Sequence, residues 1–109
     1  MDNKNTTLLK IIYFQLRNDK ILENLSTPDC RVGINLRVKP NSMFNRICVN
    51  IKPYSRTHVY VNKGNIEIWD KIEASGYIKI NIQNNKENLI EKIVEVILED
   101  YKKCVKIKH

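Results

Sequence analysis

The 109-residue sequence lacks the patterns that mark secreted, membrane-spanning and metal-binding proteins. Its three cysteines are an odd number without CxxC spacing, which argues against a disulfide framework and against a zinc site. No apolar run approaches the roughly 18 residues that a membrane-spanning helix needs, and no charged and then apolar leader opens the chain. We therefore expect a cytoplasmic protein with reduced cysteines, without a membrane partner and without a metal or other cofactor.

Signature motifs of nucleic-acid-binding families are missing as well. The sequence has no RNP-type aromatic consensus, no GxxG clamp and no zinc-finger spacing. It also has no internal repeat, linker or low-complexity segment, and its length suits one domain. The ligand of this chain must therefore be inferred from its surfaces and not from a motif.

Acidic residues are absent between Arg31 and Lys63. The net charge of the whole chain is +7, and this stretch alone contains seven basic residues, namely Arg31, Arg37, Lys39, Arg46, Lys52, Arg56 and Lys63. Another four lysines lie in residues 102–109. Such an excess favours anionic partners but does not specify a fold.

Helical periodicity predicts a helix near each end of the chain. In the first helix, Thr6 or Thr7 is a suitable N-cap, and the apolar pattern runs on to a stop near residues 26–28. Because the apolar arc is wide, we expect this helix to pack across the sheet and to be nearly buried; the alternative is that one flank contacts a second copy or another partner. The second helix is predicted to follow Asn84 or Asn85, with exposed glutamates at every fourth position: Glu87, Glu91, Glu95 and Glu99.

Between the helices the apolar period changes from 3.6 residues to 2, which is typical of half-buried strands. The clearest turn is at Lys63-Gly64, because glycine tolerates the positive φ of a two-residue hairpin loop. That loop would pair Val61 with Ile66 and Val59 with Ile68, with all four side chains on one face.

These elements combine into one predicted α+β domain over residues 1–109, with residues 102–109 as a basic tail. We expect a five-stranded antiparallel sheet in the order α-β-β-β-β-β-α, with the C-terminal helix packed on one face.

The other face of the predicted sheet would carry the positive charge beside aromatic residues. Cations neutralise phosphates, and aromatic rings stack on bases, so this combination predicts a non-enzymatic module that binds DNA or RNA. The alternatives are that the first helix covers this face or that its charges are only solvated. The candidate binding residues of this face and its adjoining turns are Arg37, Lys39, Arg46, Lys52, Arg56, His58, Tyr60, Trp69, Tyr77 and Lys79.

Two other functions compete with nucleic-acid binding. A protein-interaction regulator of phage or mobile-element origin, for example an inhibitor of a host nucleic-acid machine, would meet an anionic protein surface through the same face, or would use the first helix, which could also form a homodimer. A metal-free ribonuclease would use Lys52, Tyr54, Arg56, His58 and Tyr60. Cys48 and His58 would form a thiol–imidazole pair if their strands are neighbours, but no third group is in view to orient them.

The last strand and helix carry a resemblance to known families. The residues concerned are 76–90 (GYIKINIQNNKENLI), followed by Ile93, Ile97 and Tyr101. This run resembles the end of an uncharacterised domain found in bacterial predicted transport proteins and beside restriction-type nucleases. It is also similar to the close of the double-wing DNA-binding domain of a phage middle-promoter activator. Either resemblance implies an antiparallel sheet backed by a C-terminal helix, in a DNA-handling or phage-related setting.

Overall fold

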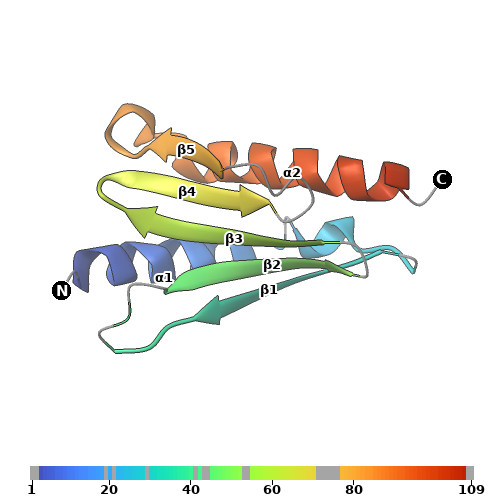
Figure 1. Ribbon diagram of the computed structural model, residues 1–109, viewed down its shortest axis with the longest axis horizontal. Helices are drawn as coiled ribbons and strands as arrows, with labels where there is room; N and C mark the ends of the chain where they lie inside the picture. Colours follow the sequence, from blue (N-terminus) through green and yellow to red (C-terminus); the bar gives the residue numbers. More distant parts are fainter. Residues whose placement is uncertain are drawn as a thin grey trace.

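Figure 1 shows the computed structural model of the chain, which describes residues 3–18, 20, 22–28, 30–40, 42, 45–52, 55–70 and 77–107. In chain order the elements are α1 (Asn3–Asn18), the 3-10 helix η1 (Glu23–Leu25), β1 (Arg31–Arg37), β2 (Arg46–Lys52), β3 (Ser55–Asn62), β4 (Asn65–Asp70), β5 (Tyr77–Asn81), the 3-10 helix η2 (Gln83–Asn85) and α2 (Leu89–Ile107). The predicted α+β fold, with five antiparallel strands between an N-terminal and a C-terminal helix, is confirmed.

The sheet is a meander in which each strand pairs with its neighbour in sequence, in the order β1-β2-β3-β4-β5. At the β3–β4 hairpin, Lys63 has a φ of 49° and Gly64 a φ of 78°. Two positive φ values in succession give a turn whose twist matches that of the flanking strands. Val61 consequently pairs with Ile66, and Val59 with Ile68, as the sequence predicts.

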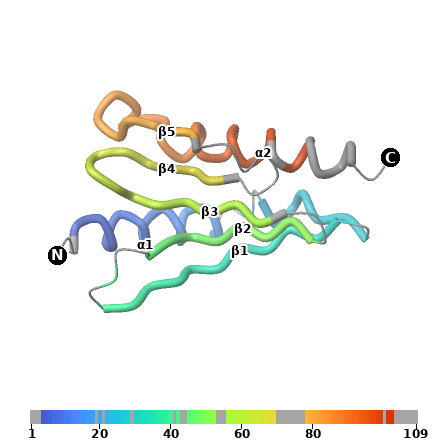
Figure 2. The backbone as a smooth tube through the Cα atoms, in the orientation of Figure 1, coloured from blue at the N-terminus to red at the C-terminus, as the bar shows by residue number. Residues whose placement is uncertain are grey.

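Both α-helices lie on the same face of the sheet, as Figures 1 and 2 show. α1 contacts β1, β2 and β3, whereas α2 contacts β3, β4 and β5. The hydrophobic core fills the space between the helices and the strands; its fully buried members include Leu9, Ile12 and Leu16 of α1, Val49, Val59 and Ile68 of the sheet, and Ile93 and Ile97 of α2. None of the described helices covers the opposite face of the sheet.

Helix α1 is shorter and less buried than the apolar pattern predicts. It ends at Asn18, and Lys20 then adopts a φ of 53°, so the chain leaves the helix axis before η1. Ile21, which the prediction placed in the helix, lies outside the described residues. Ile11 and Phe14 are 51% and 53% exposed. The expected near-complete burial is therefore wrong, because the sheet covers only one side of this helix.

Helix boundaries also differ from the prediction. α1 begins at Asn3, before the predicted caps Thr6 and Thr7. At the other end of the chain, Asn84 and Asn85 belong to η2, and α2 begins only at residue 89. Polar side chains compete with the backbone for hydrogen bonds, which explains why an Asn-rich segment delays the helix.

Helix α2 has the two-sided character that the sequence predicts. Its apolar stripe packs on the sheet, and the glutamates of the opposite side are exposed. The Tyr101 hydroxyl donates a hydrogen bond of 2.9 Å to the carbonyl oxygen of Leu25, which ties α2 to η1. The helix extends to Ile107, so it includes residues 102–107 of the predicted basic tail, while residues 108 and 109 lie outside the described part.

The outer edge of β1 is occupied in part by a side chain. The Ser26 hydroxyl accepts a hydrogen bond of 2.9 Å from the Val32 backbone N–H and donates one of 3.2 Å to the Val32 carbonyl oxygen. The N–H and carbonyl groups of Val32 thereby have hydrogen-bond partners on the side of β1 that faces away from β2.

Candidate functional site

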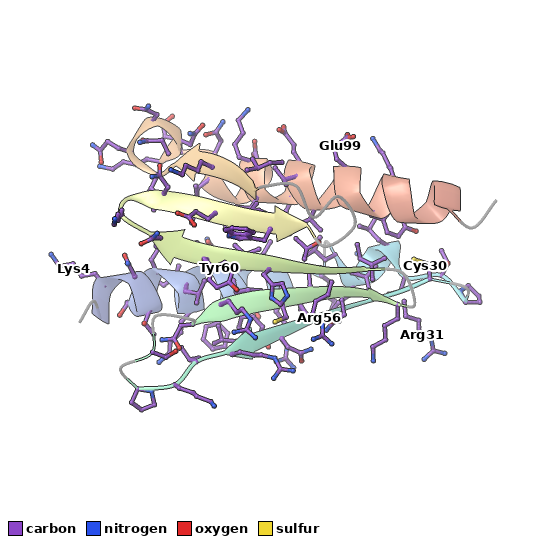
Figure 3. The ribbon with its side chains drawn as sticks, viewed as in Figure 1. Lys4, Cys30, Arg31, Arg56, Tyr60 and Glu99 are labelled. Atoms are coloured by element: carbon purple, nitrogen blue, oxygen red, sulfur yellow. The ribbon has the colours of Figure 1, made fainter. Side chains whose placement is uncertain are left out.

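The face of the sheet opposite the helices, called the open face below, is built from every second residue of each strand. One row of paired positions crosses all five strands, with Asn35, Cys48, His58, Trp69 and Tyr77 as its members. Figure 3 shows the side chains of Arg56 and Tyr60 on the side of β3 that faces the viewer, with the helices behind the sheet. The prediction left open whether the first helix covers this face; it does not, because α1 packs on the other side.

Positive charge dominates the open face. Among its described side chains, six are basic, and these are Arg31, Arg37, Arg46, Lys52, Arg56 and Lys79. One carboxylate opposes them: Glu67, which pairs with Lys79 and accepts a hydrogen bond of 3.1 Å from the Asn62 side chain. The field above β1, β2 and β3 is therefore positive and favours an anion.

Like charges face each other at both ends of the β1–β2 hairpin. The register places Arg31 opposite Lys52 and Arg37 opposite Arg46. Directly opposed like charges destabilise a sheet. These two pairs therefore lower the stability of the free protein, and an anion bound between them would remove part of that cost.

Between the two charged pairs, one position of β1 has no side chain to cover the sheet. The position of Gly33, opposite Asn50, has no side chain, and a Cβ built there would have no heavy atom within 4 Å. Asn50 in turn accepts a hydrogen bond of 2.8 Å from Nε of Arg56, which holds that guanidinium over β2 and β3.

The centre of the open face is a cluster of three side chains. Nε of Arg46 donates a hydrogen bond of 3.1 Å to Nδ1 of His58, and Sγ of Cys48 lies 3.5 Å from the same nitrogen. A guanidinium can only donate, so Nδ1 is an acceptor and the proton of the neutral ring is on Nε2. His58 and Cys48 are thus brought together, as their predicted strands would require.

The sulfur of this pair is not at the surface. Cys48 is 1% exposed even though its side chain is on the open face, because the longer side chains around it cover it. A cysteine nucleophile needs contact with its substrate, so this arrangement favours a packing role for the thiol. Tyr54, a member of the proposed ribonuclease set, lies outside the described residues.

Aromatic side chains lie beside the cations on the adjoining strands. Trp69 of β4 pairs with His58 of β3 and is 41% exposed. The rings of His58 and Tyr60 have centroids 6.2 Å apart and are tilted by 31°. The backbone of Tyr77 pairs with Trp69, but the Tyr77 side chain lies outside the described part of the structure.

The open face collects most of the candidate residues but not all of them. Lys39 follows the end of β1, where its backbone N–H donates a hydrogen bond of 2.8 Å to Oδ1 of Asn45. Arg31 and Glu67 belong to the face but were not among the candidate binding residues. The alternation of β1 and β4 places both side chains outward.

Comparison of the chain with known protein families, curated proteins and solved structures found no match. The resemblance of residues 76–90 to the two families named above therefore stays a prediction.

The part of the chain that the structure describes contains neither a cluster of metal-binding side chains nor a helix that could span a membrane. No three His, Cys, Asp or Glu side chains of that part are grouped so that they could hold a metal ion. None of its helices has the length and apolar character needed to cross a membrane.

Proposed function

We propose that the protein is a binding module that takes nucleic acid on its open face. One observation carries the proposal: both α-helices pack on the other face, so a sheet surface with six basic side chains and one carboxylate is left at the surface beside Tyr60 and Trp69. Phosphates are the anions that such a surface suits, because arginine and lysine side chains neutralise them and release condensed counterions.

The salt dependence of binding measures how many of these cations contact phosphates. If all six did, the slope of log K against log salt would be about −4 on a single strand and about −5 on duplex DNA, because each contact releases condensed counterions. For an anionic protein partner, the slope of log K against log salt would not be proportional to a number of phosphate contacts.

The experiment is an anisotropy titration of labelled DNA and RNA across a range of salt concentrations. The double variant Arg37→Gln, Lys52→Gln should bind more weakly and reduce the slope by about 1 to 2 units. A matched control, Lys10→Gln with Lys102→Gln, removes the same charge from the two helices. Retention of both binding and slope by the open-face variant would contradict the proposal, as would the absence of any binding at low salt.

An observation on α1 favours a second function, protein interaction. Ile11 and Phe14 are three residues apart on α1, and both are about half exposed. A two-fold contact places the same patch of each copy against the other, so a short apolar flank can serve both partners. Our second candidate is therefore a homodimer through α1.

Sedimentation over a range of protein concentrations tests this homodimer. We expect the wild-type protein to dimerise as its concentration rises and the Phe14→Ser variant to stay monomeric. Gln15 is the next exposed residue of α1, and the control variant Gln15→Ser should dimerise as the wild type does. A wild-type protein that is monomeric throughout would remove this candidate.

A further inference from the structure

We infer that the ligand is a single strand of nucleic acid, with its phosphates over β1 and β2 and its bases on the aromatic side chains of β3 and β4. This inference rests on the proposed function and adds the class of ligand and its direction across the sheet. It follows from the placement, on the open face, of four of the six cations on β1 and β2 and of the described aromatic rings on β3 and β4.

The cations form a track that runs along the strands. Arg31 and Lys52 mark one end and Arg37 and Arg46 the other. These pairs are six residues apart on each strand, which corresponds to about 20 Å at about 3.3 Å per residue. A sugar-phosphate backbone that followed this track would meet cations at both ends.

The middle of the track allows a close approach to the sheet. Gly33 lies between the two charged pairs, and a Cβ at that position would point into open space. A glycine inside a strand often marks a place where another backbone comes close. Arg56, held by Asn50 on the β3 side, supplies a further cation along the same path.

The aromatic rings lie to one side of this track and not within it. His58 and Tyr60 are on β3 and Trp69 is on β4, one and two strands beyond β2. Neighbouring strands are about 4.8 Å apart, so the rings begin one strand spacing from Arg46 and Lys52 of β2. A strand whose phosphates follow β2 would therefore direct its bases toward Tyr60 and Trp69.

A duplex does not satisfy this arrangement. Its bases are stacked inside the helix, and proteins reach their edges by inserting a helix or a ribbon into a groove. The open face is a sheet surface on which the described chain places no helix. Exposed aromatic rings on a sheet suit the unstacked bases of a single strand, which DNA and RNA share.

The single tryptophan of the chain gives a direct readout, because Trp69 is the residue on which a base would stack. Oligo(dT) and oligo(U) should quench its fluorescence. A length of about 12 nucleotides is suitable, because single-strand-binding OB folds cover about 4 to 16 nucleotides each. A duplex of the same length at the same salt should bind about tenfold more weakly or worse. Quenching by oligo(dT) or by oligo(U) supports the inference. The stronger of the two affinities identifies whether DNA or RNA is preferred.

Two substitutions test the geometry by anisotropy with labelled oligonucleotides. Trp69→Ala should weaken single-strand binding about tenfold, while Trp69→Phe keeps a ring and most of the affinity. Gly33→Val should weaken binding by a similar factor because its side chain would block the track. Its thermal unfolding should show an intact fold, since a Cβ at this position has no heavy atom within 4 Å. Lys10→Gln on α1 is the control for unchanged binding.

The outcomes separate this inference from the proposed function. Equal affinity for duplex and single strand, with no effect of Trp69→Ala or Gly33→Val, overturns the inference and leaves nucleic-acid binding intact. Absence of binding to every oligonucleotide at low salt overturns both. If single-strand binding is lost in Trp69→Ala but kept in Trp69→Phe and in Lys10→Gln, the inference is supported.

Discussion

Arg46 and His58 are joined by a hydrogen bond of 3.1 Å from Nε of the guanidinium to Nδ1 of the imidazole. The bond links β2 to β3 across the middle of the open face. Because arginine has no acceptor, the bond requires the neutral ring of His58 to carry its proton on Nε2.

The first prediction is that His58 has one tautomer. Long-range proton–nitrogen NMR spectra of the neutral ring should show Nε2 protonated and Nδ1 bare. In Arg46→Met the donor is gone, and we expect signals from both tautomers. A wild-type ring with its proton on Nδ1 would contradict the geometry at the centre of this face.

A second prediction concerns the like charges of the β1–β2 hairpin. Arg37→Glu replaces the Arg37–Arg46 repulsion by an attraction, so the free energy of unfolding in urea should rise by about 0.2 to 1 kcal/mol at low salt. Affinity for nucleic acid should fall in the same variant. Lys10→Glu, an exposed position on α1, controls for net charge and should show neither change.

Opposite signs for stability and affinity are the informative result. If Arg37→Glu lowers both, the loss of affinity reflects a damaged fold, and the role of this residue in binding is not supported.

A third prediction follows from the burial of two thiols. Cys30 and Cys48 are 3% and 1% exposed, so an alkylating reagent should modify them slowly in the native protein and quickly in urea. Peptide mass spectrometry after timed labelling distinguishes them. Fast native labelling of Cys48 would mean that the side chains around it do not cover the sulfur.

The fourth prediction addresses the β3–β4 turn. Gly64→Ala should lower the free energy of unfolding by about 1 to 2 kcal/mol, because an alanine at a φ of 78° is strained although no neighbouring atom would clash with its methyl group. Lys63→Gly, at a φ of 49°, should relieve strain and raise the stability or leave it unchanged. Urea denaturation of both variants gives the comparison, and a neutral Gly64→Ala would argue against this turn conformation.

Sequence alone predicted the sheet well because period-2 alternation and one tight turn determine register together. The Lys63-Gly64 loop allows one pairing of Val59 with Ile68, and a slip by one residue would turn every apolar side chain outward. The identity of the open face followed from the same parity.

The helices were predicted less well, since their ends and exposure depend on tertiary contacts. Neither glycine nor proline marks the end of α1 at Asn18, and the turn at Lys20 requires a left-handed backbone that its sequence does not indicate. Exposure of Phe14 depends on where the sheet ends. Burial of Cys48 could not be predicted from its strand either, because alternation places its side chain outward and the neighbouring side chains bury it.

The hydroxyl of Ser26 has a consequence for how copies of the protein meet. β1 is an edge strand, and unpaired backbone groups on such an edge can recruit a strand from another molecule. Ser26 occupies both backbone groups of Val32, so an incoming strand would have to displace it before pairing there. We therefore expect Ser26→Ala to increase edge-to-edge aggregation on storage. In the wild-type protein, the Ser26 hydroxyl would then help to keep the chain soluble.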